Sequence, residues 1–215
     1  MDEPKFDTTF FERYAMITLC RLLGKRFANL RNADRPDLQD VNQSIGIEVT
    51  RAIKENKIDA ELLVNNLAGS NVFDVEIDEA DMHDIQQYGY SYGLNDNSSI
   101  GRLERQYWSL ALPLKRIIKS KVHKVADGFY GDFRHFGLYI FSREPLSHIE
   151  VQLTVDYIAD LQRNNIRQYS FLYIAQTSQF YVCNLENRHI DEFSISREQR
   201  RSFYRAAVTK IPKSY

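Results

Sequence analysis

The hydrophobic positions of this chain follow two periods, one typical of helices and one typical of strands. Spacings of three and four residues predict amphipathic helices, whereas alternation and short apolar runs predict strands. The helical spacing covers residues 8–23, 55–68, 98–126 and 151–161 and the tail from Ser196. The strand patterns cover residues 37–41, 45–50, 136–141, 171–175 and 180–185. This order predicts an α/β or α+β fold with a central mixed sheet flanked by helices.

Two of the predicted strands form a hairpin around the polar turn at residues 42–44. With the turn centred between Asn42 and Gln43, Asp37 faces Glu48 across the strand pair. Directly opposed β-carbons lie about 5 Å apart, and like charges at that distance repel. A divalent cation between the two carboxylates removes the repulsion, because hard cations take carboxylate oxygens as ligands. The alternative is an exposed acidic pair on a solvated hairpin, with one carboxylate turned away.

These residues also resemble the signature of a known family. Pro36-Asp37, ten further residues and then Glu48-Val49-Thr50 are similar to the motif of the PD-(D/E)XK nuclease superfamily. The resemblance implies a restriction-endonuclease-like αβββαβ core, here as a single domain over residues 1–215. It also implies that Asp37 and Glu48 hold Mg²⁺ or Mn²⁺, with the backbone carbonyl of Val49 as a further ligand.

One position departs from the family motif. The family carries a lysine, thought to orient or activate the attacking water, where this chain has Thr50. A threonine hydroxyl can hydrogen-bond a water molecule but brings no positive charge. Lys54, which shares the strand parity of Glu48, and Lys115 and Lys119 on a later helix are candidates for supplying that charge. Otherwise the activity is altered or absent.

Two more residues are candidates for the site. The family often adds a glutamate from its first helix, and Glu12 occupies that place here. Residues 9–12, Thr-Phe-Phe-Glu, also have the form of a capping box, which explains Glu12 without any metal. Gln39 shares strand parity with Asp37 and is either a supporting residue of the site or a plain surface residue.

Charge is unevenly distributed although the net charge of the 215 residues is only −1. Between Ile58 and Gly101 there is no lysine or arginine, and there are nine acidic residues. We interpret residues 70–98 as an acidic insertion, which repels a phosphate backbone and is suited to contact a protein partner. Its tyrosines at 88, 90 and 92 stack on bases or belong to a packed surface loop.

The helix that follows is basic. Seven lysines and arginines lie between Arg102 and Lys124, against the single acidic residue Glu104. Such a face either follows phosphates or is simply solvated. Lys115 and Lys119 are four residues apart and share a face, so these two are the predicted nucleic-acid-binding residues.

Other functional classes find no support in the sequence. Cys20 and Cys183 fit no disulfide framework or metal spacing, and the five histidines are scattered. No apolar run reaches membrane-spanning length, and the first residues do not form a signal peptide. We therefore expect a cytoplasmic protein with no membrane partner. Nothing in the pattern indicates the oligomeric state.

Three functions follow from these observations. The first is Mg²⁺- or Mn²⁺-dependent hydrolysis of phosphodiester bonds in nucleic acid, in DNA rather than RNA. The second is a catalytically inactive nuclease-fold protein that binds nucleic acid or a protein, which the substitution by Thr50 and the acidic insertion favour. The third is a structural protein in which the hairpin motif is a coincidence.

Overall fold

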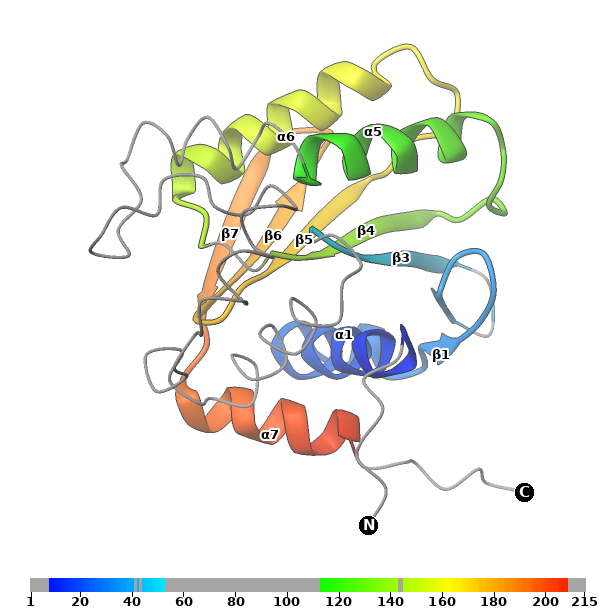
Figure 1. The fold of residues 1–215 in the computed structure, drawn as a ribbon. Helices are drawn as coiled ribbons and strands as arrows, with labels where there is room; N and C mark the ends of the chain where they lie inside the picture. The colour runs from blue at the N-terminus through cyan, green and yellow to red at the C-terminus, as the bar shows by residue number, and fades with distance from the viewer. Residues whose placement is uncertain (1–7, 41, 43, 53–112, 143–144, 209–215) are drawn as a thin grey trace, which may run out of the picture.

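The computed structural model describes residues 8–40, 42, 44–52, 113–142 and 145–208 (Figure 1). Its helices are α1 (Thr8–Leu23), the 3₁₀ helix η1 (Lys25–Phe27), α5 (Pro113–Ala126), α6 (His148–Gln162) and α7 (Arg197–Val208). Its strands are β1 (Arg31–Asn32), β2 (Leu38–Gln39), β3 (Ile45–Arg51), β4 (His135–Phe141), β5 (Phe171–Ala175), β6 (Gln179–Asn184) and β7 (His189–Ser194). The predicted helix at 55–68, the acidic insertion at 70–98 and Lys54 lie outside the described residues.

The strands form one mixed sheet of seven, in the spatial order β1 to β7. β3, β4 and β5 run parallel to one another, and every other neighbouring pair is antiparallel. Helices α5 and α6 cover one face of the sheet, and α1 and α7 cover the other (Figure 1). The prediction of a mixed sheet flanked by helices is confirmed, but the sheet has more strands than an αβββαβ core.

Strand alternation divides the interior into two hydrophobic clusters. On β4, Leu138 and Ile140 pack beneath α5 and α6, whereas Tyr139 and Phe141 pack against α1 and α7. All seven residues of β4 are buried, as expected of a central strand covered on both faces. On β3 the buried Ile45 and Ile47 join the α1 side, so Gly46 and Glu48, which alternate with them, face α5.

Most predicted elements in the described residues are present with boundaries shifted by at most a few residues. Helix α1 ends at Leu23 because Gly24 adopts a φ of 87°, a conformation that favours glycine. Strand β7 was not predicted, because only a few of its residues are even partly buried and it carries charged residues at the sheet edge. No helix in the described part of the chain is long and apolar enough to cross a membrane.

Gly46 allows the loop before β4 to pack against the α5 side of β3. A β-carbon added at Gly46 would lie 2.6 Å from the ring of Phe133, closer than real contacts permit. Phe133 in turn stacks on Phe136, with ring centroids 5.6 Å apart. The missing side chain therefore lets this ring sit over the strand that carries Glu48.

We expect Gly46→Ala to lower the free energy of unfolding by about 1–3 kcal/mol, the usual cost of overpacking. Gly131→Ala is the matched control, because its added β-carbon would meet the same Phe133 ring at an ordinary 3.5 Å. Urea denaturation of both variants measures the difference. Equal midpoints for the two alanine variants would show that Phe133 moves aside without cost.

Candidate functional site

The register of the hairpin brings the two predicted carboxylates together. Leu38 pairs with Ile47 and Gln39 pairs with Gly46, which is the predicted register, and the next position places Asp37 beside Glu48. Asp40 closes the turn, because its carboxylate accepts hydrogen bonds from the Ser44 hydroxyl at 2.5 Å and the Ile45 N–H at 2.8 Å. The turn thus fixes a register that the alternation of β3 also requires.

The carboxylate of Asp37 is bound to the backbone of β3. Its Oδ2 accepts a hydrogen bond of 2.7 Å from the N–H of Val49, the residue after Glu48. Burial first, and then the negative charges of Glu48 and Glu12, raise the pKa of Asp37 to about 7. The Val49 N–H and Lys121 act in the opposite direction. The structure therefore has a close, repelling acidic pair, and the buried Glu48 excludes the alternative of a fully solvated one.

A lysine that the sequence analysis did not select lies at this pair. Lys121 of α5 forms an ion pair with Glu48, and only 19% and 8% of the two side chains are exposed. The sequence does indicate that Lys121 faces inward, because it lies three residues after Ile118 and four before Val125 in the apolar stripe of α5. A lysine inside such a stripe faces the sheet, where it needs an acidic partner.

Lys115 and Lys119 lie elsewhere on α5. Both side chains are exposed, and the Lys115 ammonium lies 5.1 Å from the ring centre of Tyr157 on α6. Among the described contacts, neither lysine reaches Asp37 or Glu48. They do not replace the motif lysine, and their role in binding nucleic acid stays a prediction.

Glu12 approaches the site from α1. Its charge contributes to the raised pKa of Asp37, and its Oε2 accepts a hydrogen bond of 2.5 Å from the side-chain amide of Asn32 on β1. Helix α1 begins at Thr8, so Thr9 lies inside the helix and not at the cap position that the capping box requires. The position of Glu12 near Asp37 is the arrangement that the metal hypothesis expects.

The other predicted residues have different positions. Gln39 donates hydrogen bonds to the carbonyls of Asp34 (3.3 Å) and Pro36 (3.1 Å), so it supports the bend that leads into Asp37. Thr50 is half-buried and lies two residues after Glu48, on the same face of β3.

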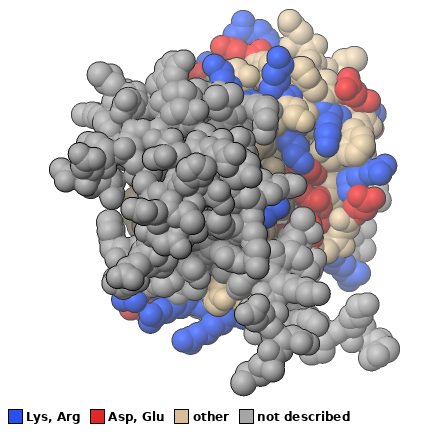
Figure 2. Space-filling view, in the orientation of Figure 1, with Lys and Arg blue, Asp and Glu red and all other residues tan. Residues whose placement is uncertain are grey.

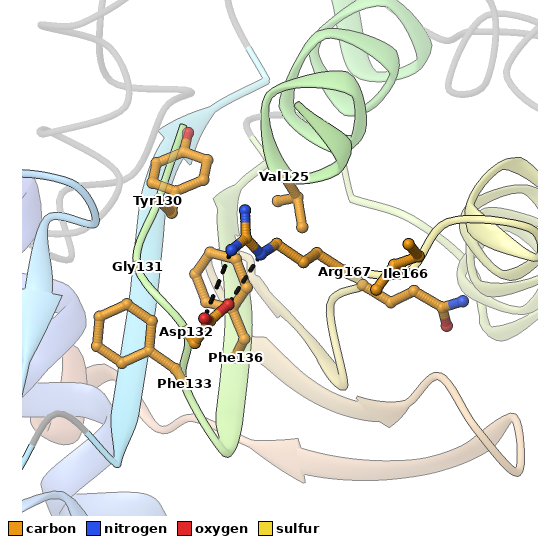
Figure 3. Close-up of a pocket in the computed structure, with 9 residues that line it drawn as sticks. Val125, Tyr130, Gly131, Asp132, Phe133, Phe136, Ile166 and Arg167 are labelled. Carbon is orange, nitrogen blue, oxygen red and sulfur yellow. Dashed lines mark hydrogen bonds and ion pairs between the residues drawn. The ribbon is translucent and has the colours of Figure 1, made fainter. Parts of the chain in front are cut away.

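Two buried tyrosine hydroxyls lie close to Glu48. Those of Tyr130 and Tyr169 make no hydrogen bond of standard geometry with the described residues, but the Tyr130 hydroxyl lies near both Glu48 and Tyr169. Burial and the Glu48 charge both raise the pKa of Tyr130. Figure 3 shows that Tyr130 lines a pocket together with the Arg167–Asp132 ion pair and that its hydroxyl is directed away from that pair. The loop between α5 and β4 thus places a buried phenol hydroxyl beside the acidic pair.

The donor set suits one class of metal better than others. Within the described residues, no three His, Cys, Asp or Glu side chains group as metal ligands, which leaves a pair of carboxylates and nearby backbone oxygen. Mg²⁺ is commonly held by one or two carboxylates and completes its shell with water and phosphate oxygens.

Comparison of this sequence and structure with protein-family models, curated proteins and solved structures finds no match.

In the presence of a chelator, we expect Asp37 to make the protein less stable as the pH rises from about 4 to about 7. The pKa of Asp37 is about 7 in the folded state and about 3.9 in an unfolded chain. Between these values the folded state binds more protons, so the free energy of unfolding falls with rising pH. Asp37→Asn removes this contribution and gains stability relative to the wild type above about pH 7.

Urea denaturation between about pH 5 and about pH 8 measures this effect. Asp127→Asn, a change at an exposed residue outside the site, controls for the loss of one charge. A constant difference between wild type and Asp37→Asn across that range would contradict the raised pKa.

Proposed function

We propose that this protein is a divalent-metal-dependent nuclease with a PD-(D/E)XK-like site, which hydrolyses phosphodiester bonds in DNA in preference to RNA. The observation that carries the proposal is the site itself: Asp37 and Glu48 lie together on the β2–β3 hairpin, with the ammonium of Lys121 on Glu48. Two carboxylates and a lysine are the functional groups of the family motif, although here the lysine comes from a helix.

The order of elements supports the same family. Apart from the 3₁₀ helix η1, the described elements α1, β1, β2, β3, α5 and β4 occur in the order αβββαβ, which the resemblance implies, with residues 53–112 between β3 and α5 outside the described part. β5, β6 and β7 then extend the sheet on the far side of β4. The hairpin is reached from α1, and Glu12 on that helix lies near Asp37, as in the expected core.

The residues present fit a hard divalent cation. Asp37 and Glu48 would hold Mg²⁺ or Mn²⁺, with the Val49 carbonyl and Glu12, directly or through water, as further ligands. The pKa of Asp37 is raised first by burial and then by the negative charges of Glu48 and Glu12, and a bound cation would relieve the repulsion among these carboxylates. A bound cation of this class lowers the pKa of its water and neutralises charge on phosphoryl oxygens.

Lys121 supplies the positive charge that Thr50 lacks. Its ammonium forms an ion pair with the buried carboxylate of Glu48, as a charged group removed from water requires. It has three N–H donors, so those not used by Glu48 can orient a water or a phosphoryl oxygen beside the pair. Thr50, on the same face of β3, can hold that water through its hydroxyl.

The same ion pair also favours the second candidate function, a nuclease fold without catalysis. An ammonium in contact with Glu48 can act as a permanent internal cation and make a metal unnecessary. In that case the fold serves binding alone, to nucleic acid or to a protein at the acidic insertion, whose residues lie outside the described part. The response to metal separates the two functions.

We expect the purified protein to cleave plasmid DNA, single-stranded DNA or RNA with Mg²⁺ or Mn²⁺ and not with chelator. Asp37→Asn and Glu48→Gln should abolish cleavage by removing ligand charge. Lys121→Gln should reduce it roughly a hundredfold, in the range of a lost catalytic group. Lys25→Gln, the same charge change at an exposed residue of η1, is the matched control.

Denaturation midpoints of the variants show whether each one is folded, since Glu48→Gln leaves Lys121 without its partner. The catalytic proposal fails if no substrate is cut, or if folded Glu48→Gln cuts as fast as the wild type.

Metal should also stabilise the folded protein. Binding to the native state alone adds about 2.7 kcal/mol at a hundred times the dissociation constant. We expect Mn²⁺ or Mg²⁺ to raise the Tm of the wild type and to have little effect on Asp37→Asn. Scanning fluorimetry across a metal titration measures this shift. An unchanged wild-type Tm would favour the internal ion pair of the second candidate function.

A further inference from the structure

An exposed aromatic ring at the end of α5 lies between two cations from distant parts of the chain. Phe129 is 45% exposed. The guanidinium of Arg35, from the loop between β1 and β2, lies 4.8 Å from its ring centre, and the ammonium of Lys124 lies 5.2 Å from it. The two cations are therefore at most about 10 Å apart. We call these three residues the Phe129 cluster.

The Phe129 cluster adjoins the acidic pair through its neighbours on both chain segments. Arg35 precedes Asp37 by two residues, and Lys124 follows Lys121 by three, which places both lysines on one side of α5. Tyr130, the residue after Phe129, lies close enough to Glu48 to be influenced by its charge. The Phe129 cluster is therefore connected to the acidic pair through short stretches of chain on both sides, so a strand bound at Asp37 and Glu48 can extend to it.

The contacts within the protein leave these cations largely available. Arg35 is 3.6 Å from Asp34, but both side chains are mostly exposed, and such pairs contribute little. Lys124 has no carboxylate partner among the described residues. A ring that holds two like charges together at the surface stabilises the fold weakly, since exposed cation–π contacts are modest. An anionic ligand explains the arrangement better.

Local cations matter here because the surface as a whole is not basic. The net charge is −1, and Figure 2 shows lysine and arginine interspersed with acidic residues over the part of this face that is not grey. The overall charge therefore gives a polyanion little attraction, and discrete positions where cations are concentrated carry more of its binding. The Phe129 cluster provides two cations and an exposed aromatic ring at one such position.

We propose that Arg35, Lys124 and Phe129 bind the sugar–phosphate backbone of a nucleic-acid strand next to the bond that is cleaved. The two cations contact phosphates and displace counterions, and the exposed part of the ring packs against a sugar or base. Such contacts position the strand without reading its sequence. The reference to a cleaved bond rests on the proposed function, but the binding itself does not.

Fluorescence anisotropy with labelled single-stranded DNA, duplex DNA and RNA tests the proposal in chelator, where no cleavage occurs. We expect Arg35→Gln/Lys124→Gln to bind at least one of these ligands roughly tenfold more weakly than the wild type. The slope of log affinity against log salt should fall by about 2, one for each lost phosphate contact. Phe129→Leu should weaken binding with less change in that slope.

The control variant is Lys25→Gln/Arg163→Gln, which also removes one lysine and one arginine, from exposed positions in η1 and just after α6. The proposal is overturned if the control loses as much affinity as the Arg35→Gln/Lys124→Gln variant. It is also overturned if that variant binds like the wild type, or if the wild type binds none of the three ligands. Weakened binding in a protein that shows no metal-dependent cleavage supports the Phe129 cluster and refutes only the nuclease proposal.

Discussion

The burial of two opposed carboxylates under α5 is the constraint on which the rest of this site depends. A charged group removed from water is costly unless it is paired and hydrogen-bonded. The carboxylate of Asp37 accepts a hydrogen bond from the Val49 N–H, and the carboxylate of Glu48 forms an ion pair with the ammonium of Lys121. The hydrogen bond to Asp37 requires the observed hairpin register, and the ion pair with Glu48 requires α5 to direct Lys121 toward the sheet. Removing either partner leaves a buried charge uncompensated, which is far more damaging than losing a surface ion pair.

The alternation of β3 connects this constraint to the hydrophobic core. Ile45 and Ile47 belong to the cluster around α1 and α7, so Glu48 points to the α5 side. A slip of one residue in the pairing would move Glu48 into the apolar cluster and bring Ile47 out of it. Gly46 reinforces the same orientation, because Phe133 occupies the space above it. The core and the acidic pair thus select the same register.

Features that depend on neighbouring residues, such as the hairpin register, could be predicted from the sequence. The turn and the alternation around it were enough to predict the pairing of Asp37 with Glu48, because both act within fifteen residues. Lys121 was missed because its partner is 73 positions away, and the i, i+4 spacing drew attention to Lys115 and Lys119 instead. The contact of Arg35 with Phe129 is likewise long-range, and no local period encodes it. Strand β7 was missed for another reason, since an exposed edge strand lacks the apolar alternation of a buried one.

The charges of the site bear on whether Lys121 takes the place of a metal ion or leaves room for one. Asp37, Glu48 and Glu12 are three carboxylates, and one ammonium balances one of them when all are ionised. Of the influences on the pKa of Asp37, the attraction of Lys121 is the smallest, and the pKa remains raised to about 7. Lys121 therefore pairs with Glu48 and does little to lower the pKa of Asp37. Because burial is the largest cause of the raised pKa, a proton on Asp37 relieves the site as a cation would, so the response to metal, and not the count of charges, distinguishes a metal site from an internal ion pair.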